Sequence, residues 1–299
     1  MPAPQQPGSQ NSLASPATGH DSRSLRERIE RRLWRTWKPL RHQFGHELPR
    51  SYVFVAGMQR SGTNMLMEML EWSRWTDVYH EFDNRAFDNY EMRPRGVIRS
   101  LATNSTAPFF VIKSLCELEQ VRSLMDEFKP AKTLWLLRGY DDGVNSAIRS
   151  FGNFASQVRR LARDKSAADW RGRGMSDDTQ HLLRQLAHPA MGEASAAALM
   201  WYYRNVLFFE QGLDRDPRVK LMRYEDLVGD PAEVMRETFE FLGVPNWSPW
   251  ISRYVHVKSV GKSPRADIEP AVRELCQSLR DRFDALDGFA IRNSAKAAV

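Results

Sequence analysis

Eight consecutive residues, Gly57-Met-Gln-Arg-Ser-Gly-Thr-Asn64, have the composition of a loop that binds phosphate. They join a short apolar, β-branched run to a stretch with a helical pattern. Backbone amides at the start of a helix point outward and meet an anion with a favourable dipole. The two glycines let the backbone fold tightly around phosphate oxygens. The sequence therefore predicts a phosphate-binding loop between a strand and a helix.

The position of the cation in this loop indicates which kind of phosphate it binds. An ATP-binding loop needs Gly-x-x-x-x-Gly-Lys-Ser/Thr, in which the lysine contacts the terminal phosphates and the hydroxyl binds magnesium. Gly57 and Gly62 have that separation, but Thr63 follows, and the cation is Arg60, inside the loop. This arrangement disfavours ATP and suits a loop that binds a single phosphate carrying a leaving group, without a metal.

The segment Arg60-Ser61-Gly62-Thr63-Asn64 resembles the donor loop of the sulfotransferase family, whose usual form is Lys or Arg followed by Ser-Gly-Ser/Thr-Thr/Ser. A second segment, Leu134-Trp-Leu-Leu-Arg138 with Ser146, resembles the family's arginine at a strand end and serine eight residues later. The resemblance implies that this pair holds the 3′-phosphate of the donor, 3′-phosphoadenosine 5′-phosphosulfate (PAPS). Arginine supplies a charge-assisted fork and serine a short hydroxyl donor. Gly139-Tyr140 replaces the family's Asn/Asp-Pro, so the turn is expected to differ in shape.

Two later segments extend the resemblance over about Tyr52 to Pro264. The run from Arg223 to Pro231, followed by Phe239 to Pro245, resembles the family's Tyr-Glu-Asp-Leu strand end and Phe-Leu-Gly helix. These residues are expected to be structural. Ser259-Val-Gly-Lys262 resembles the basic, glycine-containing loop that closes over the 3′-phosphate, which makes Lys262 a candidate donor-binding residue.

The resemblance implies transfer of a sulfuryl group from PAPS to a hydroxyl or amine of a carbohydrate, lipid or other small-molecule acceptor. Arg60 and the loop amides would carry the charge of the leaving phosphate, with Thr63 and Asn64 as further hydrogen-bond donors. Lys113 would touch the sulfuryl group, as the matching lysine does in relatives. No metal is expected, because the seven histidines show no ligand spacing.

A general base should remove the proton of the acceptor. In the cytosolic branch of the family a histidine follows a Lys-Thr pair, whereas Lys113-Ser-Leu115 has leucine there. The chain therefore resembles the carbohydrate and bacterial type more than the cytosolic phenol and steroid type. The other branch uses a carboxylate shortly after the loop helix, and Asp77-Val-Tyr-His-Glu-Phe-Asp83 offers several groups there. We expect Glu81 to be the base, with His80 second; alternatively, Glu81 only pairs with a nearby arginine.

The elements that must position these residues alternate along the chain. Predicted buried strands span 51–57, 109–113, 133–137 and 219–224, and predicted helices span 64–72, 117–128, 143–151, 194–211 and 232–242. This alternation predicts an α/β fold, a three-layer sandwich with a central parallel sheet and a P-loop-like phosphate-binding loop.

The domain organisation follows from composition. Residues 1–22 are rich in Pro, Gln, Ser, Gly and Ala and are predicted to be disordered. Residues 23–46 are predicted to contain a basic amphipathic helix, which either docks on the protein body or contacts anionic lipid or substrate. Residues 51–290 form the predicted sulfotransferase domain. Its polar insertion at about 155–189 is expected to be a lid or a disordered excursion.

Overall composition limits the alternatives. The 299 residues include 43 basic and 37 acidic side chains, a net charge of +6, and their mean hydropathy of −0.54 is typical of a soluble protein. The two cysteines form no disulfide framework, and no signal-peptide or membrane-spanning run is visible, so a cytoplasmic location is expected. The charge excess is mild, and we expect no nucleic-acid partner. A P-loop nucleotide or nucleoside kinase and a non-catalytic module that binds anionic glycans are the alternatives.

Overall fold

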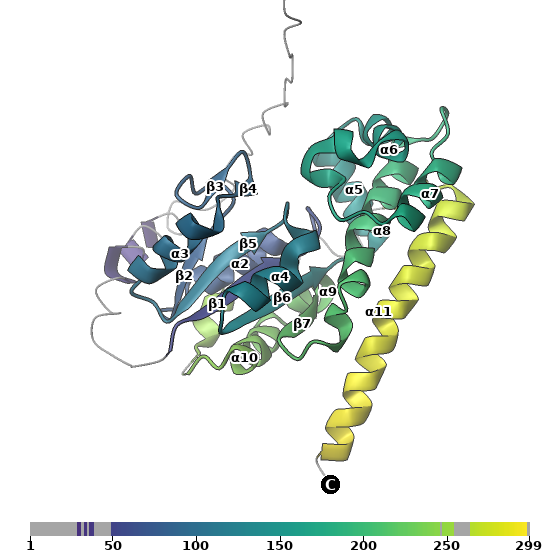
Figure 1. Ribbon diagram of the computed structural model, residues 1–299. Coiled ribbons are helices and arrows are strands. Elements are labelled where there is room, and N and C mark those ends of the chain that lie inside the picture. The colour runs from purple at the N-terminus through teal and green to yellow at the C-terminus, as the bar shows by residue number, and fades with distance from the viewer. Residues whose placement is uncertain are drawn as a thin grey trace, which may run out of the picture.

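The computed structural model describes residues 29–30, 33–34, 36–38, 49–245, 247–253 and 264–297. A five-stranded sheet forms its centre (Figure 1), in the order β2-β5-β1-β6-β7. The strands are β1 (Ser51–Ala56), β2 (Thr76–Tyr79), β5 (Phe109–Ser114), β6 (Ala131–Leu137) and β7 (Val219–Arg223). All of their pairings are parallel. The predicted α/β fold with a central parallel sheet is confirmed.

Helices cover both faces of this sheet, which explains the apolar runs that predicted its strands. Each face packs against its own group of helices. Phe54 and Ala56 of β1 lie in the core shared with one group, here called the first, and Val53 and Val55 lie in the core shared with the second. The first group contains α3 (Arg95–Asn104), η1 (Leu118–Gln120), α4 (Val121–Glu127), α5 (Tyr140–Ser150), α8 (Glu193–Glu210), η3 (Leu213–Arg215) and α11 (Pro270–Ala297). The second contains α2 (Thr63–Glu71), α9 (Tyr224–Gly229), α10 (Pro231–Leu242) and η4 (Pro249–Ser252). Three layers result.

The strand order has a switch point between β1 and β6. β1 lies between β5 and β6, and the chain leaves β1 towards β2 but leaves β6 towards β7. Ligands of open α/β sheets bind outside the carboxyl ends of strands at such a switch point. The loop after β1 and the turn after β6 therefore lie side by side, although their sequences are far apart.

The helices differ from the predicted ranges in a few places. α5 begins at Tyr140, three residues before the predicted start, because Gly139 serves as its N-cap. The predicted helix at 117–128 is divided into η1 and α4. A two-stranded hairpin of β3 (Phe87–Asp88) and β4 (Glu91–Met92) precedes α3. These elements and α11 were not predicted.

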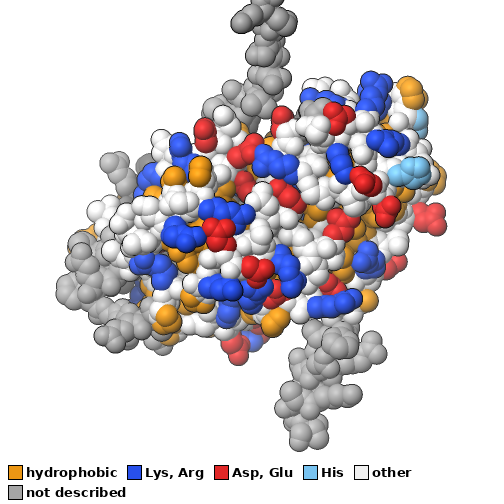
Figure 2. All heavy atoms as spheres, viewed as in Figure 1, with side chains coloured by type: hydrophobic (Ala, Val, Ile, Leu, Met, Phe, Trp, Pro, Cys, Tyr) orange, Lys and Arg blue, Asp and Glu red, His pale blue; other side chains and the backbone are white. Residues whose placement is uncertain are grey.

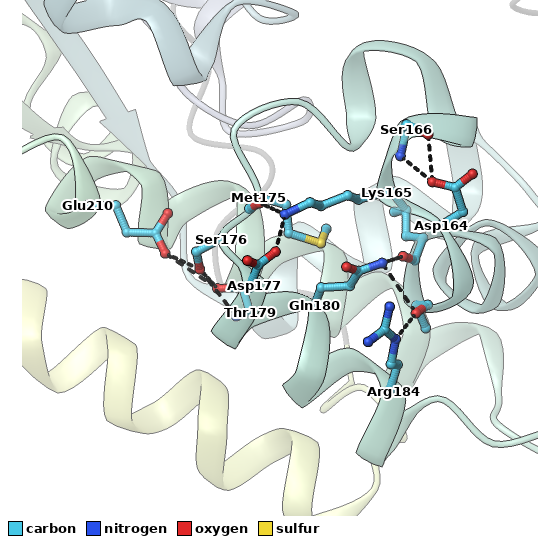
Figure 3. Close-up of polar contacts among 12 residues, drawn as sticks. Asp164, Lys165, Ser166, Met175, Ser176, Asp177, Thr179, Gln180, Arg184 and Glu210 are labelled. Carbon is cyan, nitrogen blue, oxygen red and sulfur yellow. Dashed lines mark hydrogen bonds and ion pairs between the residues drawn. The ribbon is translucent and has the colours of Figure 1, made fainter.

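The insertion at about 155–189 is folded into α6 (Phe154–Arg163), η2 (Lys165–Arg171) and α7 (Asp177–Leu186), close to α8 (Figures 1 and 3). Gln180 Nε2 donates to Leu161 O over 3.2 Å, and Arg184 Nε donates to Ala162 O over 2.7 Å. Ser176 Oγ donates to Glu210 Oε1 of α8 over 2.9 Å. The segment is thus tied to the protein body; its role as a lid stays a prediction.

Charged side chains of both signs are intermixed on the face shown in Figure 2. Some of the surface charge is paired locally: Arg95 pairs with Glu127 over 2.7 Å and Arg236 with Glu233 over 2.5 Å. No helix among the described residues is long and apolar enough to cross a membrane. Within the same residues, no group of three or more His, Cys, Asp or Glu side chains could hold a metal ion.

Candidate functional site

The loop between β1 and α2 has a backbone that side chains would obstruct. Gly57 and Gly62 have φ of 144° and 97°, in the region that favours glycine. A Cβ atom at Gly57 would lie 2.4 Å from the carbonyl oxygen of Leu136, and one at Gly62 would lie 2.3 Å from Cδ2 of Tyr224. Both glycines are therefore required for close approach to Leu136 of β6 and to Tyr224, the first residue of α9. Arg60, with φ of 69°, is held in a conformation that is uncommon for a side-chain-bearing residue.

The start of α2 has the properties of an anion site. Gly62 is its N-cap and provides no side-chain hydrogen bond to the first-turn amides. Ser61 and Thr63 are buried beside these amides. Ser61 Oγ has no hydrogen-bond partner within the described part of the chain. An uncapped helix start, a glycine cradle and an unsatisfied hydroxyl together fit a bound phosphate group.

The turn after β6 brings a second cation to the loop. Arg138 directly follows β6 and is 7% exposed. Its Nη1 atom donates to the backbone oxygen of Arg60 over 3.1 Å, and its guanidinium carbon lies 4.2 Å from the ring centre of Tyr224. Arg60 Nε donates to Oγ of Ser146, on α5, over 3.1 Å. The structure thus joins Arg60 to both Arg138 and Ser146; the predicted role of these residues in donor binding stays a prediction.

The electrostatics of this group favour an anion. Burial lowers the pKa of Arg60, and the neighbouring positive charges of Arg138 and Arg149 lower it further, against a smaller opposing effect of Tyr224. A negative group that binds beside Arg60 would offset the repulsion from these neighbouring positive charges. The site is therefore arranged for at least one phosphate-type ligand.

Hydrogen bonds fix the backbone around Arg138. Trp201 Nε1 donates to the carbonyl oxygen of Arg138 over 2.9 Å, and the amide of Gly139 donates to Glu225 Oε1 over 2.9 Å. The Glu225 carboxylate accordingly pairs within the fold, as expected. Lys262 lies outside the described residues. The nearest described residue, Pro264, accepts a hydrogen bond of 2.8 Å from Asn145 Nδ2 on α5, the helix that carries Ser146.

A second polar cluster lies at the carboxyl end of β5. Lys113 is 1% exposed, and its Nζ lies 2.5 Å from Glu81 Oε1. Lys113 Nζ also donates to Oδ1 of Asn64, in the first turn of α2. Burial lowers the pKa of Lys113, and the attraction of Glu81 opposes this shift only in part. The partner of Glu81 is thus a lysine of the predicted site and not an arginine.

Only one of the two carboxylate oxygens of Glu81 is hydrogen-bonded to Lys113, so the other is able to act as a hydrogen-bond or proton acceptor. Oε1 is engaged by Lys113, whereas Oε2 is buried and has no hydrogen-bond partner among the residues that the structure describes. His80 is directed elsewhere, with Nε2 3.9 Å from Glu71 Oε2, and burial lowers its pKa. Asp83 pairs with Arg85 over 2.5 Å. Glu81 is therefore the one of these three groups that is joined to the phosphate loop, through Lys113 and Asn64.

Sequence reasoning missed the place of Tyr224 in this site. The residue directly follows β7, and its ring lies against both Gly62 and Arg138. Its position at the carboxyl end of a predicted parallel strand was the available signal, because such ends share one edge of the sheet. Glu117, buried three residues beyond the end of β5 with its pKa raised to about 7 by burial, was also missed.

Comparison with known proteins identifies the fold. A family model described as a sulfotransferase domain matches residues 50–260. The sulfotransferase domain from the curacin biosynthetic pathway has a TM-score of 0.50 and 14% identity, over 79% of this chain and 99% of that one. A sulfotransferase from Alicyclobacillus acidocaldarius has a TM-score of 0.46 and 18% identity, over 79% and 95%. Mouse sulfotransferase SULT7A1 complexed with PAP has a TM-score of 0.42 and 13% identity, over 84% and 91%. No curated protein sequence matches significantly.

Proposed function

The chain belongs to the sulfotransferase family, and we propose that it transfers a sulfuryl group from PAPS to a hydroxyl or amine of a carbohydrate, lipid or other small-molecule acceptor. The observation that carries the donor assignment is the Arg60–Ser146–Arg138 group beside the glycine loop. It offers two neighbouring places for negative charge, one at the start of α2 and one between β6 and α5. A donor with two separate phosphate positions fits this layout.

The residues present fit such a donor. The first-turn amides of α2, with Ser61, Thr63 and Asn64, would hold the phosphate that carries the leaving group. Arg138 and Ser146 would hold the 3′-phosphate, with Lys262 as a further candidate. When bound, PAPS supplies a sulfuryl group whose transfer leaves negative charge on the adjoining phosphate. Glycines at positions 57 and 62 let the loop pack closely against Leu136 and Tyr224, because a Cβ atom at either position would collide with these neighbours.

Arg60 and Lys113 would stabilise the charge that develops during transfer. Fixed cations in a site that excludes water are effective because they need no reorganisation as charge moves. Ser146 and Arg138 hold Arg60 from two sides. Glu81 and Asn64 hold Lys113, which is almost wholly buried. Both cations are thus preorganised by neighbouring side chains.

Glu81 would act as the general base. Its Oε1 is fixed by Lys113, and its buried Oε2, which has no partner among the described residues, is able to accept the proton of an acceptor hydroxyl or amine. Lys113 thereby serves two purposes: it orients the base and places a positive charge beside the reacting groups.

A donor-dependence assay tests this proposal. Purified protein is incubated with radiolabelled PAPS, or with labelled ATP and magnesium, against separate pools of sugars, lipids and phenols. We expect labelled product only with PAPS, and about a 10²–10³-fold lower rate in Arg60→Ala. Product formed from ATP and magnesium alone would establish the kinase alternative. Glycan binding that is unaffected by Arg60→Ala, with turnover from neither donor, would establish the binding module.

A further inference from the structure

The N-terminal helix, described at residues 29–30, 33–34 and 36–38, is attached to the protein body by its polar and aromatic side. Trp34 Nε1 donates to the carbonyl oxygen of Glu71 over 3.0 Å. Lys38 Nζ donates to the same oxygen over 2.8 Å and to Thr76 Oγ1 over 3.3 Å. These bonds satisfy a carbonyl at the end of α2, which the α-helix itself leaves open.

Further contacts fix the orientation of this helix. The Trp34 ring lies 6.0 Å from that of Trp72 and 5.9 Å from that of Trp250. Glu30 Oε2 pairs with Arg253 over 3.3 Å, and the Arg253 guanidinium stacks on the Trp250 ring. The helix therefore cannot rotate about its axis without breaking several contacts. As a result, the side chains on its opposite face point away from the protein body.

That other face is apolar. Ile29, Leu33 and Trp37 are 51%, 54% and 59% exposed, and their spacing of four residues places them on one side of a helix. The periodicity predicted the amphipathic helix, but the apolar stripe is not the side that docks. Single exposed apolar side chains are ordinary, whereas a contiguous exposed stripe marks an interaction surface.

The charge of the surrounding sequence indicates what the stripe contacts. The segment from residue 23 to residue 41 contains eight basic side chains and two acidic ones, Glu27 and Glu30. Glu30 is already paired with Arg253. An apolar stripe within a strongly basic segment, with tryptophan among its residues, is typical of a helix that lies in the interface of an anionic membrane.

A second copy of the chain fits this surface less well. Most closed dimers use a twofold contact that brings the same patch of both copies together. Such a contact through Ile29, Leu33 and Trp37 would face two strongly basic segments against each other, which is unfavourable. A bilayer with anionic headgroups instead satisfies the charge and the apolar stripe at once.

We propose that the face formed by Ile29, Leu33 and Trp37 is a docking surface for an anionic lipid bilayer. The three side chains enter the boundary between headgroups and acyl chains, while the basic residues of the segment contact the headgroups. The helix docks at Glu71, the last residue of α2, whereas the phosphate loop ends in the first turn of α2. Membrane contact therefore leaves the loop end of α2 uncovered and does not depend on the donor.

Vesicle co-sedimentation of the full chain tests this proposal. The vesicles contain phosphatidylcholine alone, or equal parts of phosphatidylcholine and phosphatidylglycerol. We expect binding to the anionic vesicles only, weakened about tenfold or more in Leu33→Gln/Trp37→Gln, since that change removes most of the apolar area that the bilayer would bury. Val97→Gln is the matched control, because Val97 is a 39% exposed apolar side chain on α3.

Three results would overturn the proposal. The first is absence of binding to the anionic vesicles by the unaltered chain. The second is equal binding by the double variant and the control, with thermal melting showing that both are folded. The third is a concentration-dependent dimer, seen by light scattering, that the double variant abolishes; a second copy would then cover the stripe. Donor-dependent turnover in solution is expected to be the same in all of these variants.

Discussion

Arg60 Nε donates a hydrogen bond of 3.1 Å to Ser146 Oγ across 86 residues of sequence. Arg138 completes this connection, since its Nη1 donates to the backbone oxygen of Arg60. The cation of the phosphate loop and the two residues expected to bind the 3′-phosphate therefore form one connected group. A substitution at either phosphate position should therefore alter the contacts, and so the binding, at the other position.

This connection predicts coupled effects of Arg60→Ala and Ser146→Ala. Arg60→Ala should lower kcat about 10²–10³-fold through lost charge stabilisation. Ser146→Ala should raise the KM for PAPS about tenfold, as expected for one hydrogen bond to a charged group. In the double variant the loss in kcat/KM should be smaller than the product of the single losses, because each change already disturbs the shared contact. Steady-state kinetics with varied PAPS measure all three.

Ser150→Ala is the control for this cycle, because Ser150 is exposed at the last residue of α5. Its kinetic constants should match those of the unaltered enzyme. Strictly multiplicative losses in the double variant would show that Arg60 and Ser146 act independently, contrary to the observed contact.

Gly62→Ala tests the steric requirement of the loop. The added Cβ would lie 2.3 Å from Cδ2 of Tyr224, at a φ of 97°. We expect destabilisation of about 1–3 kcal/mol, which corresponds to a fall in thermal midpoint of several degrees, together with weaker PAPS binding. Calorimetry and equilibrium binding measure these effects. Gly96→Ala is the matched control: Gly96 is in α3 and a Cβ there meets nothing within 4 Å, so its midpoint should stay equal or rise. A midpoint of Gly62→Ala equal to that of the control would contradict the collision.

The sequence was sufficient to predict the four strands β1, β5, β6 and β7 and the positions of Arg60 and Arg138 after two of them, for a simple physical reason. Buried parallel strands are short apolar runs, and functional residues gather at their carboxyl ends. The loop at Arg60 and the turn at Arg138 each follow such a run directly. Their adjacency then depends only on β1 and β6 being neighbours.

Other features depend on three-dimensional packing that no local pattern encodes. The Lys113–Glu81 pair arises because the four-residue strand β2 lies beside β5, and so short a strand carries little signal. The N-terminal helix docks through Trp34 and Lys38 because a carbonyl of α2 needs donors. Hydrophobicity alone favours the opposite face. In α11, by contrast, the buried residues Val272, Cys276, Leu279 and Phe283 have helical spacing, so that helix was predictable from the sequence.

The identity of the general base is tested by comparing Glu81→Gln, Glu81→Asp and His80→Gln. We expect Glu81→Gln to lower kcat about 10²–10⁴-fold, because Gln cannot accept the proton at Oε2. Glu81→Asp should recover part of this loss, since it keeps a carboxylate. His80→Gln should change kcat little, because its ring is directed towards Glu71.

Thermal melting accompanies these kinetics, because Glu81→Gln leaves the buried Lys113 without its counter-charge and should also destabilise the fold. A kcat of His80→Gln as low as that of Glu81→Gln, with both variants folded at the assay temperature, would move the role of base to His80.

Glu117→Gln tests a buried carboxyl that the proposed reaction does not use. Glu117 is 5% exposed and accepts a hydrogen bond of 2.7 Å from the amide of Met92. Burial raises its pKa from 4.5 to about 7, and the negative charges of Glu119 and Glu91 add to the shift. The folded protein thus binds this proton more tightly than the unfolded chain does. The stability it contributes is fully present below pH 4.5 and is lost as the pH rises through about 7.

Gln resembles the protonated carboxyl and keeps the acceptor for Met92, so it should remove this pH dependence. Between mildly acidic and mildly alkaline pH, the free energy of unfolding should fall by about 2 kcal/mol less in Glu117→Gln than in the unaltered protein. Urea unfolding at several pH values measures the difference. The control is Glu274→Gln, an exposed position on α11, which should follow the unaltered protein at every pH. If Glu117→Gln also follows it, Glu117 is ionised throughout this range, and its carboxylate has a charge partner that compensates for burial.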